Sequence, residues 1–386
     1  MAEHLAILTT TTIELSERFE STLSSPYEEP GPAVPEPSST NDALPLLSNS
    51  SSALKAQVTK LSLFAINTPF TPSALSTVLS PINDSVLPTL VTAALLIKPN
   101  GYTKAFHSET HILTKTVLRD LIKLVHEVKT IAAKKNETKA QNPKSKEEEL
   151  SQSEKDTVTV ATGHVWDSCD ALISLAENGV MGFVARRVEE WRNLVRDAVE
   201  ELEEWDPEEE EGDDFLDELL GDGENADDVG AQKASAIDED QAARPKADTT
   251  ALHEQKKLAL RVLKPIAQIF PAIDANRLRN SKISPASRSS PDICTLEALM
   301  LNLQSITGNV DEAAGALYEG DVQTCCRYLK KAKIDATDAI NLVVFPWCKE
   351  ETDSEKRPED RFTIWSKTWL KVVNEVSRPI DDAAER

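Results

Sequence analysis

The chain has 386 residues, of which 40 % are apolar, 5 % aromatic and 28 % charged. This is more than one small core requires, so two domains are expected. The net charge of −23 argues against direct binding to nucleic acid or to an anionic membrane, because both need an excess of Lys and Arg opposite phosphate groups.

Cysteine usage and the lack of targeting patterns bear on the compartment. The five cysteines are odd in number and show no C-x-x-C spacing, which is typical of free thiols in a reducing environment. The N-terminal residues lack a basic region followed by a long apolar core, so no signal peptide is expected. No stretch reaches about 18 uninterrupted apolar residues, so no membrane-spanning helix is expected either. We therefore expect the protein in the cytosol or the nucleus.

The composition favours helices over strands, since Leu, Ala, Val, Lys and Glu dominate and only 12 glycines are present. Apolar side chains three or four residues apart mark the helices of the N-terminal part. The Pro-rich segment 24–45 and the charged segment 134–154 are expected to be loops. The expected helices cover 3–24, 51–67, 72–98 with bends at Pro81 and Pro88, 103–133, and 155–177 with Val158, Val165, Cys169, Leu172 and Ala176 inward.

Residues 178–205 show the most regular pattern of this part. Their apolar side chains alternate spacings of three and four, and this 3.5-residue period keeps one seam facing a neighbouring helix. The helix can pack with the N-terminal set or begin the C-terminal one, and the sequence leaves both open. The seam contains Met181, Val184, Val188, Trp191, Val195, Ala198, Leu202 and Trp205.

Four more helices are expected after the acidic residues that follow position 205. The first, 256–279, should kink at Pro265 and Pro271. Small residues on the apolar stripe of 322–343 let that helix approach its neighbours closely. The other two helices are 296–317 and a last one, 362–376, with Phe362, Trp365, Trp369, Val372 and Val376 as its apolar residues.

The fold class expected from these segments is all-α, with two antiparallel bundles of four to five helices each. No alternating apolar and polar run bounded by turn residues indicates a strand. The expected division is an N-terminal bundle at 1–205, an acidic disordered linker at 206–248 and a C-terminal bundle at 249–386.

The acidic segment contains one apolar cluster that fits partner binding. Helical geometry places four apolar side chains on one face with acids around them, as in a short amphipathic helix that docks into a basic-rimmed apolar groove. The alternatives are a lid that folds back onto its own bundle and, for the surrounding acid, a plain solvated linker. Trp191 and Trp205 are further candidate anchors, although Trp191 also fits a core position. The cluster consists of Phe215, Leu216, Leu219 and Leu220, with Asp213, Asp214, Asp217 and Glu218 around it.

Patterns for chemistry are weak. His107 and His111 are one helical turn apart, a spacing able to hold a metal, but no third ligand is evident and two solvated or boundary histidines are the favoured interpretation. Cys325-Cys326 is interpreted as a buried thiol rather than a redox pair. Ser284 and Ser290 precede prolines in a basic loop and are candidate phosphorylation sites. We expect no catalytic residue, metal or cofactor.

The segment 163–205, which begins GHVWDSCDALISL and continues as a helix rich in Val, Arg and Glu into the acidic run, resembles the cyclin-D-interacting, GCIP-like family together with LLIKPNGYTKAFHSETH (95–111) upstream. The match extends over about 50–380. The resemblance implies helical bundles like those of talin- and vinculin-type proteins, and a non-enzymatic regulator that binds D-type cyclins or sequesters helix-loop-helix factors. The motif residues are Gly163, Val165, Trp166, Cys169, Asp170 and Leu172.

The expected function is therefore that of a protein–protein adaptor and negative regulator of the cell cycle, with cyclin-like or helix-loop-helix partners. A cytoskeletal adaptor of the talin and vinculin kind is the alternative, although an acidic surface suits acidic filaments badly. An enzyme with a metal in the bundle core is disfavoured, because no Glu-x-x-His motif occurs.

Overall fold

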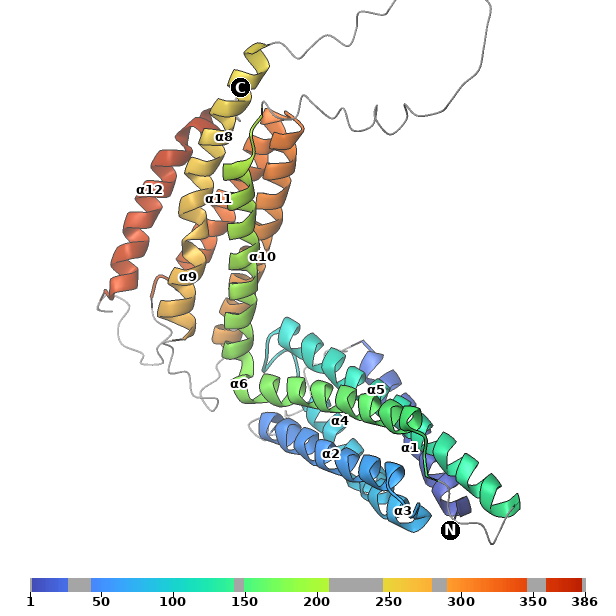
Figure 1. Ribbon diagram of the computed structural model, residues 1–386. Helices are drawn as coiled ribbons and strands as arrows, with labels where there is room; N and C mark the ends of the chain where they lie inside the picture. Colours follow the sequence, from blue (N-terminus) through green and yellow to red (C-terminus); the bar gives the residue numbers. More distant parts are fainter. Residues whose placement is uncertain are drawn as a thin grey trace, which may run out of the picture. The chain divides into compact units, whose positions relative to one another are not determined.

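The computed structural model describes residues 2–26, 43–141, 149–207, 246–279, 290–345 and 359–383. Within these ranges the protein is helical and has no strand, which confirms the all-α prediction (Figure 1). Contacts divide the chain into two compact units. Unit 1 runs to Val184 and includes 282–297, whereas unit 2 comprises 185–281 and 298–386.

Unit 1 is a bundle in which α1 packs on α5 and α3, and α2 packs on α3 and α4. The inward residues expected for 155–177 are all buried. The helices are α1 (Ala2–Ser24), α2 (Ala43–Ile66), α3 (Pro72–Pro81), α4 (Leu87–Leu96), α5 (Lys104–Gln141) and the first part of α6 (Gln152–Glu204).

The bends expected at Pro81 and Pro88 are confirmed by a π-helical turn, Ile82–Val86, between α3 and α4. Proline removes a backbone donor and so interrupts the regular helical ladder. The whole stretch Pro72–Leu96 is long and apolar enough to cross a membrane, but more than half of its most apolar window is buried inside the protein. A core position in unit 1 accounts for its composition.

Helix α6 answers the question that the sequence leaves open for 178–205. The helix breaks at Gly179, whose φ of 61° and ψ of −167° are not helical. Residues up to Val184 belong to unit 1 and residues from Ala185 belong to unit 2. The boundary between the two units thus lies inside this segment, whereas the sequence predicts an N-terminal bundle that ends at 205.

Unit 2 is built around α11, which contacts α8, α9 and α12. The small residues Ala332, Ala336 and Ala339 on its stripe are fully buried, as expected for close helix approach. The kinks predicted at Pro265 and Pro271 correspond to the end of α8 and to α9, which is followed by a π-helical turn, Asp274–Leu278. Beside the second part of α6, the helices are α8 (Lys246–Ala267), α9 (Ile269–Ile273), α11 (Val322–Val343), α12 (Arg361–Ala383) and α10 (Ser290–Tyr318) from Ala298 onward. The residues of α10 up to Glu297 belong to unit 1.

Several helices extend into segments that were expected to be irregular. Helix α2 begins at Ala43 rather than 51, because Pro45 lies in its first turn, where a missing N–H is tolerated. Helix α5 continues to Gln141 through part of the expected 134–154 loop, and α8 begins inside the expected linker. The prediction that Ser290 lies in a loop is wrong, since Ser290 is the first residue of α10.

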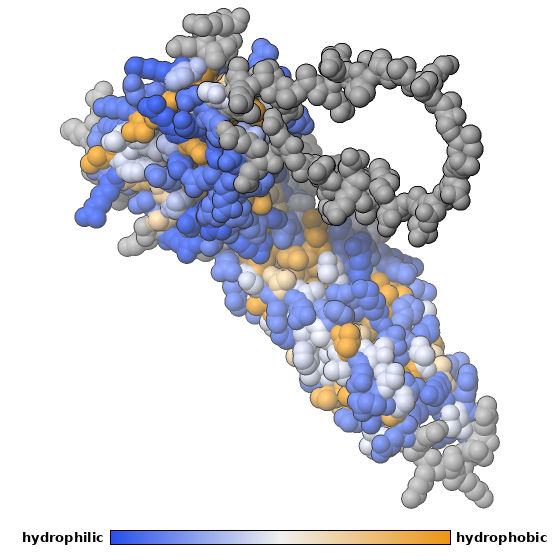
Figure 2. Space-filling model, turned by 45° about the horizontal axis from the view of Figure 1, so that its top comes forward, coloured by the Kyte–Doolittle hydropathy of each residue, from blue (hydrophilic) through white to orange (hydrophobic). Residues whose placement is uncertain are grey.

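The apolar face of α12 is also shifted from the expected one. Val372 is 44 % exposed, whereas the adjacent Val373 is fully buried. The indole N–H of Trp369 donates a hydrogen bond of 2.8 Å to the carbonyl of Pro265, which ties α12 to α8. On the face shown in Figure 2, apolar residues are scattered among hydrophilic ones over the described surface.

Candidate functional site

The motif around Trp166 forms the seam between α6 and α2. The hydroxyl of Thr162 donates to Ser62 (2.8 Å) and the indole N–H of Trp166 donates to the hydroxyl of Thr59 (3.1 Å). One turn further, Asp170 accepts from Lys55 at 2.6 Å. Residue numbers fall along α2 as they rise along α6, so the two helices run antiparallel. These contacts give the outer residues of the motif a structural role.

The other motif residues belong to the core of unit 1. Val165, Cys169 and Leu172 are each fully buried. Burial raises the pKa of the Cys169 thiol to about 12, so the thiol is protonated at neutral pH. Its reactivity is low for that reason, since the thiolate is the nucleophilic form.

We expect thiol-specific alkylation of the native protein at pH 8 to modify Cys294, which is exposed, and to spare Cys169 and Cys325. Burial also raises the pKa of Cys325, to about 11, so both of the spared thiols are inaccessible and uncharged. Peptide mapping by mass spectrometry measures the modification of each cysteine, and denatured protein serves as the control in which all react. Equal labelling of Cys169 and Cys294 in native protein would contradict the buried position of the motif.

Helices α5 and α6 form a hairpin whose second helix begins with a capping box. The Glu154 carboxylate accepts from the Ser151 backbone N–H at 2.8 Å, and the Ser151 hydroxyl accepts from the Glu154 N–H at 3.3 Å. Glu154 also accepts from Lys134 of α5 at 2.6 Å. Hydrogen bonds from Lys134 and from Ser151 hold the pKa of Glu154 at about 2. The start of α6 is thereby fixed beside α5.

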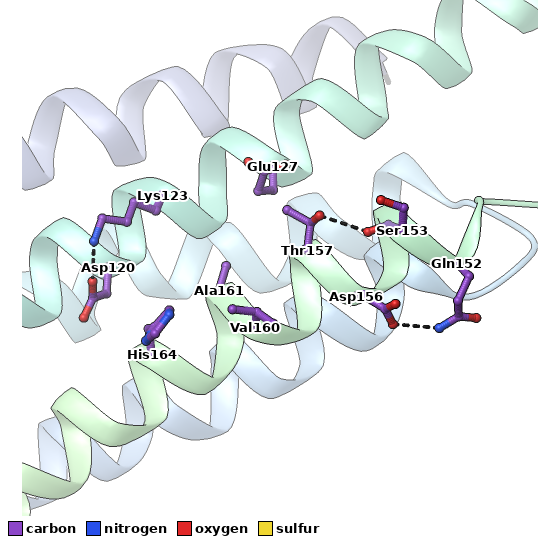
Figure 3. Close-up of a pocket in the computed structure, with 10 residues that line it drawn as sticks. All are labelled: Asp120, Lys123, Glu127, Gln152, Ser153, Asp156, Thr157, Val160, Ala161 and His164. Carbon is purple, nitrogen blue, oxygen red and sulfur yellow. Dashed lines mark hydrogen bonds and ion pairs between the residues drawn. The ribbon is translucent and has the colours of Figure 1, made fainter. Parts of the chain in front are cut away.

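An open groove of about 700 Å³ lies between these two helices (Figure 3). An apolar side chain, Val160, lies at its edge with 60 % of its surface exposed, next to the small residue Ala161. Charged side chains from both helices surround this apolar part. The remaining lining residues are Asp120, Lys123 and Glu127 from α5, and Gln152, Ser153, Asp156, Thr157 and His164 from α6.

The polar groups of the groove bond along their own helices rather than toward a common point (Figure 3). Lys123 pairs with Asp120 at 2.9 Å, and the Gln152 amide donates to Asp156 at 2.7 Å. Such an arrangement does not converge on a small substrate. An exposed apolar side chain, Val160, with Glu127 of α5 and Asp156 of α6 in the same lining instead suits an amphipathic helix that carries a basic side chain.

Comparison with known families gives a match to this part of the chain. Residues 46–208 match the family model described as Grap2 and cyclin-D-interacting, N-terminal. This part of the chain is thus similar to the N-terminal domain of cyclin-D-interacting proteins. No curated protein matches the chain. The matched range extends from α2 to the end of α6 and so contains both the α2–α6 seam and the α5–α6 groove, whereas the resemblance was expected over about 50–380.

The partner-binding residues expected from the sequence are placed as follows. Trp205 is half-buried, and its ring meets that of Tyr318 edge-on at 5.0 Å within unit 2. Trp191 is half-buried on α6. Their role in partner binding stays a prediction, as does phosphorylation of Ser290. The candidates outside the described residues are Asp213, Asp214, Phe215, Leu216, Asp217, Glu218, Leu219, Leu220 and Ser284.

The two histidines considered as metal ligands lie close together and hold helix ends. Their ring centroids are 4.1 Å apart. The Nδ1 of His107 bonds the carbonyl of Ile97 at 2.6 Å, and that of His111 bonds the carbonyl of Leu23 at 3.1 Å. Burial and the neighbouring His107 lower the pKa of His111. Within the described ranges, no group of three or more His, Cys, Asp or Glu side chains could hold a metal ion.

The groove residues were not predicted from the sequence, although the position of one apolar residue pointed to them. Val160 is an apolar residue that lies off the inward stripe of the 155–177 helix. Such a residue on an otherwise polar face is a candidate contact. Val160 and Glu127 line the same groove because α5 packs beside α6 in one particular way. The spacing of apolar residues within one helix does not predict that packing.

Proposed function

We propose that this chain is a non-enzymatic adaptor that captures a helix of a cyclin-type protein in the α5–α6 groove. The family description names cyclin D as a partner, and the groove lies inside the matched range. The single observation that carries the proposal is Val160, an apolar side chain left 60 % exposed between two acid-bearing helices.

The charges of the groove define the partner helix. Glu127 and Asp156 come from opposite sides of the groove, so a Lys or Arg of the partner can approach both carboxylates. Charge complementarity of this kind favours fast and selective encounter. We further propose that binding restrains cell-cycle progression in the cytoplasm and the nucleus. Helix-loop-helix proteins, which also present amphipathic helices, are the second partner class.

Replacing Val160 with Glu is expected to weaken capture of a purified D-type cyclin by about tenfold or more, because a charge replaces the exposed apolar contact of the groove. Biolayer interferometry with immobilised cyclin and the full chain measures the affinity. The matched control is Ile7→Glu, which changes an apolar residue of similar exposure, 58 %, on α1 of the same unit but outside the matched range.

Two results would contradict this assignment. Equal losses for the Val160 and Ile7 variants would mean that the groove is not the contact. A loss confined to a variant with Asp213, Asp214, Asp217 and Glu218 changed to Lys would place the contact in the acidic segment instead. A double variant, Glu127→Lys with Asp156→Lys, should slow association and weaken its salt dependence if the groove binds a basic side chain.

A further inference from the structure

The outer face of α11 gathers positive charge in a protein with an excess of acid. Arg327, Lys330 and Lys331 lie on its first turns, and Ile334 follows on the same side with 49 % of its surface exposed. Spacings of three and four residues place Arg327, Lys331 and Ile334 in one row along the helix. We call these four residues the α11 face.

Among the described residues, no salt bridge engages a cation of the α11 face, although Arg327 is close enough to Asp321 to contribute to the lowered pKa of that carboxyl. Two other lysines of unit 2 do form ion pairs: Lys264 bridges to Glu203, and Lys333, also on α11, bridges to Asp381 at 2.7 Å. Arg327 and Lys331 instead lie near the Tyr328 ring, at 5.1 and 4.6 Å from its centroid. These charges therefore remain available to an acidic ligand.

The opposite side of α11 makes the face a firm platform. Leu329, Ala332 and Ala336 are fully buried against the neighbouring helices of unit 2. The helix start is fixed by Asp321, whose carboxylate accepts from the Thr324 N–H at 2.9 Å. Since core packing and the N-cap already hold the backbone beneath the cations, binding of a ligand costs little further conformational entropy there.

We infer that the α11 face is a second docking site, which binds an acidic amphipathic helix of a partner protein. The acidic side chains of that helix pair with Arg327, Lys330 and Lys331, and its leucine-like side chains cover Ile334. A nucleic acid or an anionic membrane fits less well, because the net charge of −23 repels an extended polyanion and neither supplies a matching apolar row. Charge complementarity and the exposed apolar centre together select the occupant.

This inference is independent of the groove in unit 1. The groove presents acids and so selects a basic helix, whereas the α11 face selects an acidic one. An adaptor with two sites of opposite charge can hold two different partners at once, because neither ligand competes for the site of the other.

The test uses the full chain and a fluorescein-labelled synthetic helix in which Leu and Glu recur at spacings of three and four. Fluorescence anisotropy should show saturable binding that weakens as salt rises. Arg327→Glu with Lys331→Glu should weaken it by about tenfold or more, and Ile334→Ser by a smaller factor with the salt dependence unchanged. The matched control, Lys257→Glu, reverses an exposed cation of α8 in the same unit and should bind normally.

Four outcomes would overturn the inference. These are equal affinity of the double variant and the control, equal affinity for a peptide with every Leu changed to Ser, and tighter binding of duplex DNA or of phosphatidylserine vesicles. The fourth is binding that appears only when Phe215, Leu216, Leu219 and Leu220 of the chain are changed to Ser, since the chain's own acidic segment would then be the occupant. Normal peptide binding by Val160→Glu would separate this site from the groove.

Discussion

Replacing Arg277 with Ala is expected to lower the free energy of unfolding of unit 2 by about 2–4 kcal/mol, because it removes the buried donor of two main-chain carbonyls and the counter-charge of a partly exposed carboxylate. The Arg277 side chain is only 3 % exposed. Its guanidinium donates to the carbonyls of Val343 and Val344, both at 2.6 Å, and to the Asp360 carboxylate at 2.7 Å. It also lies 4.3 Å from the centroid of the Phe362 ring.

These bonds join three helix ends. Val343 ends α11 and Val344 follows it, so their carbonyls lack helical donors. Asp360 precedes α12 and accepts from the Thr363 N–H at 2.7 Å, which makes it the N-cap of that helix. Without the guanidinium, the two carbonyls lose their buried donor and the cap loses its counter-charge.

Urea unfolding followed by tryptophan fluorescence measures this loss, since Trp365 and Trp369 lie on α12. The matched control is Arg279→Ala, two residues along the chain. Arg279 pairs with Asp274 and Glu189 but is 61 % exposed, so its removal should change stability by less than about 1 kcal/mol. Comparable losses of unfolding free energy in the two variants would show that Arg277 does not hold the ends of α11 and α12 together.

The same network gives a pH dependence. The hydrogen bond from Arg277 holds the pKa of Asp360 at about 2, below its ordinary value of 3.8. A carboxyl with a lowered folded-state pKa contributes stability that is present above the unfolded-state value and is lost as the pH falls through the folded-state value. The difference in stability between the native protein and Arg277→Ala should therefore hold down to about pH 4 and shrink toward pH 2.

The spacing of apolar residues predicted the helices well, because residues three or four apart lie on one face of a helix and that face is the one that is buried. The 322–343 helix has the predicted bounds, and every inward residue expected between 155 and 177 is buried. Helix starts were less well predicted where a local signal was overlooked. The Ser151–Glu154 capping box is a sequence pattern and could have placed the start of α6 at Gln152.

Contacts between helices could not be predicted in this way. The burial of Arg277 depends on the ends of α11 and α12, which are far from it in the chain, and no spacing rule links those positions. The groove likewise requires the lateral placement of Glu127 against Val160. The error at Val372 has the same cause. Val372 and Val373 are both apolar, and the packing of α12 against α8 and α11, rather than the sequence pattern, makes Val373 the buried one.

Replacing Gly179 with Ala is expected to destabilise unit 1 by about 1–3 kcal/mol, although the substitution adds only one methyl group. The φ of 61° and ψ of −167° at this position lie in a region that is essentially restricted to glycine. A Cβ there would meet only the Leu44 Cδ1, at an ordinary 3.8 Å. The expected loss therefore comes from the backbone rather than from a clash.

A control of opposite sign lies in the same helix. Gly163 is inside the regular part of α6, and a Cβ added there meets nothing within 4 Å. Gly163→Ala should thus stabilise unit 1 by up to about 1 kcal/mol, since alanine is the better helix former. Urea unfolding followed by circular dichroism measures both variants. If Gly179→Ala were also neutral or stabilising, the break in α6 at Gly179 would not be a requirement of the fold.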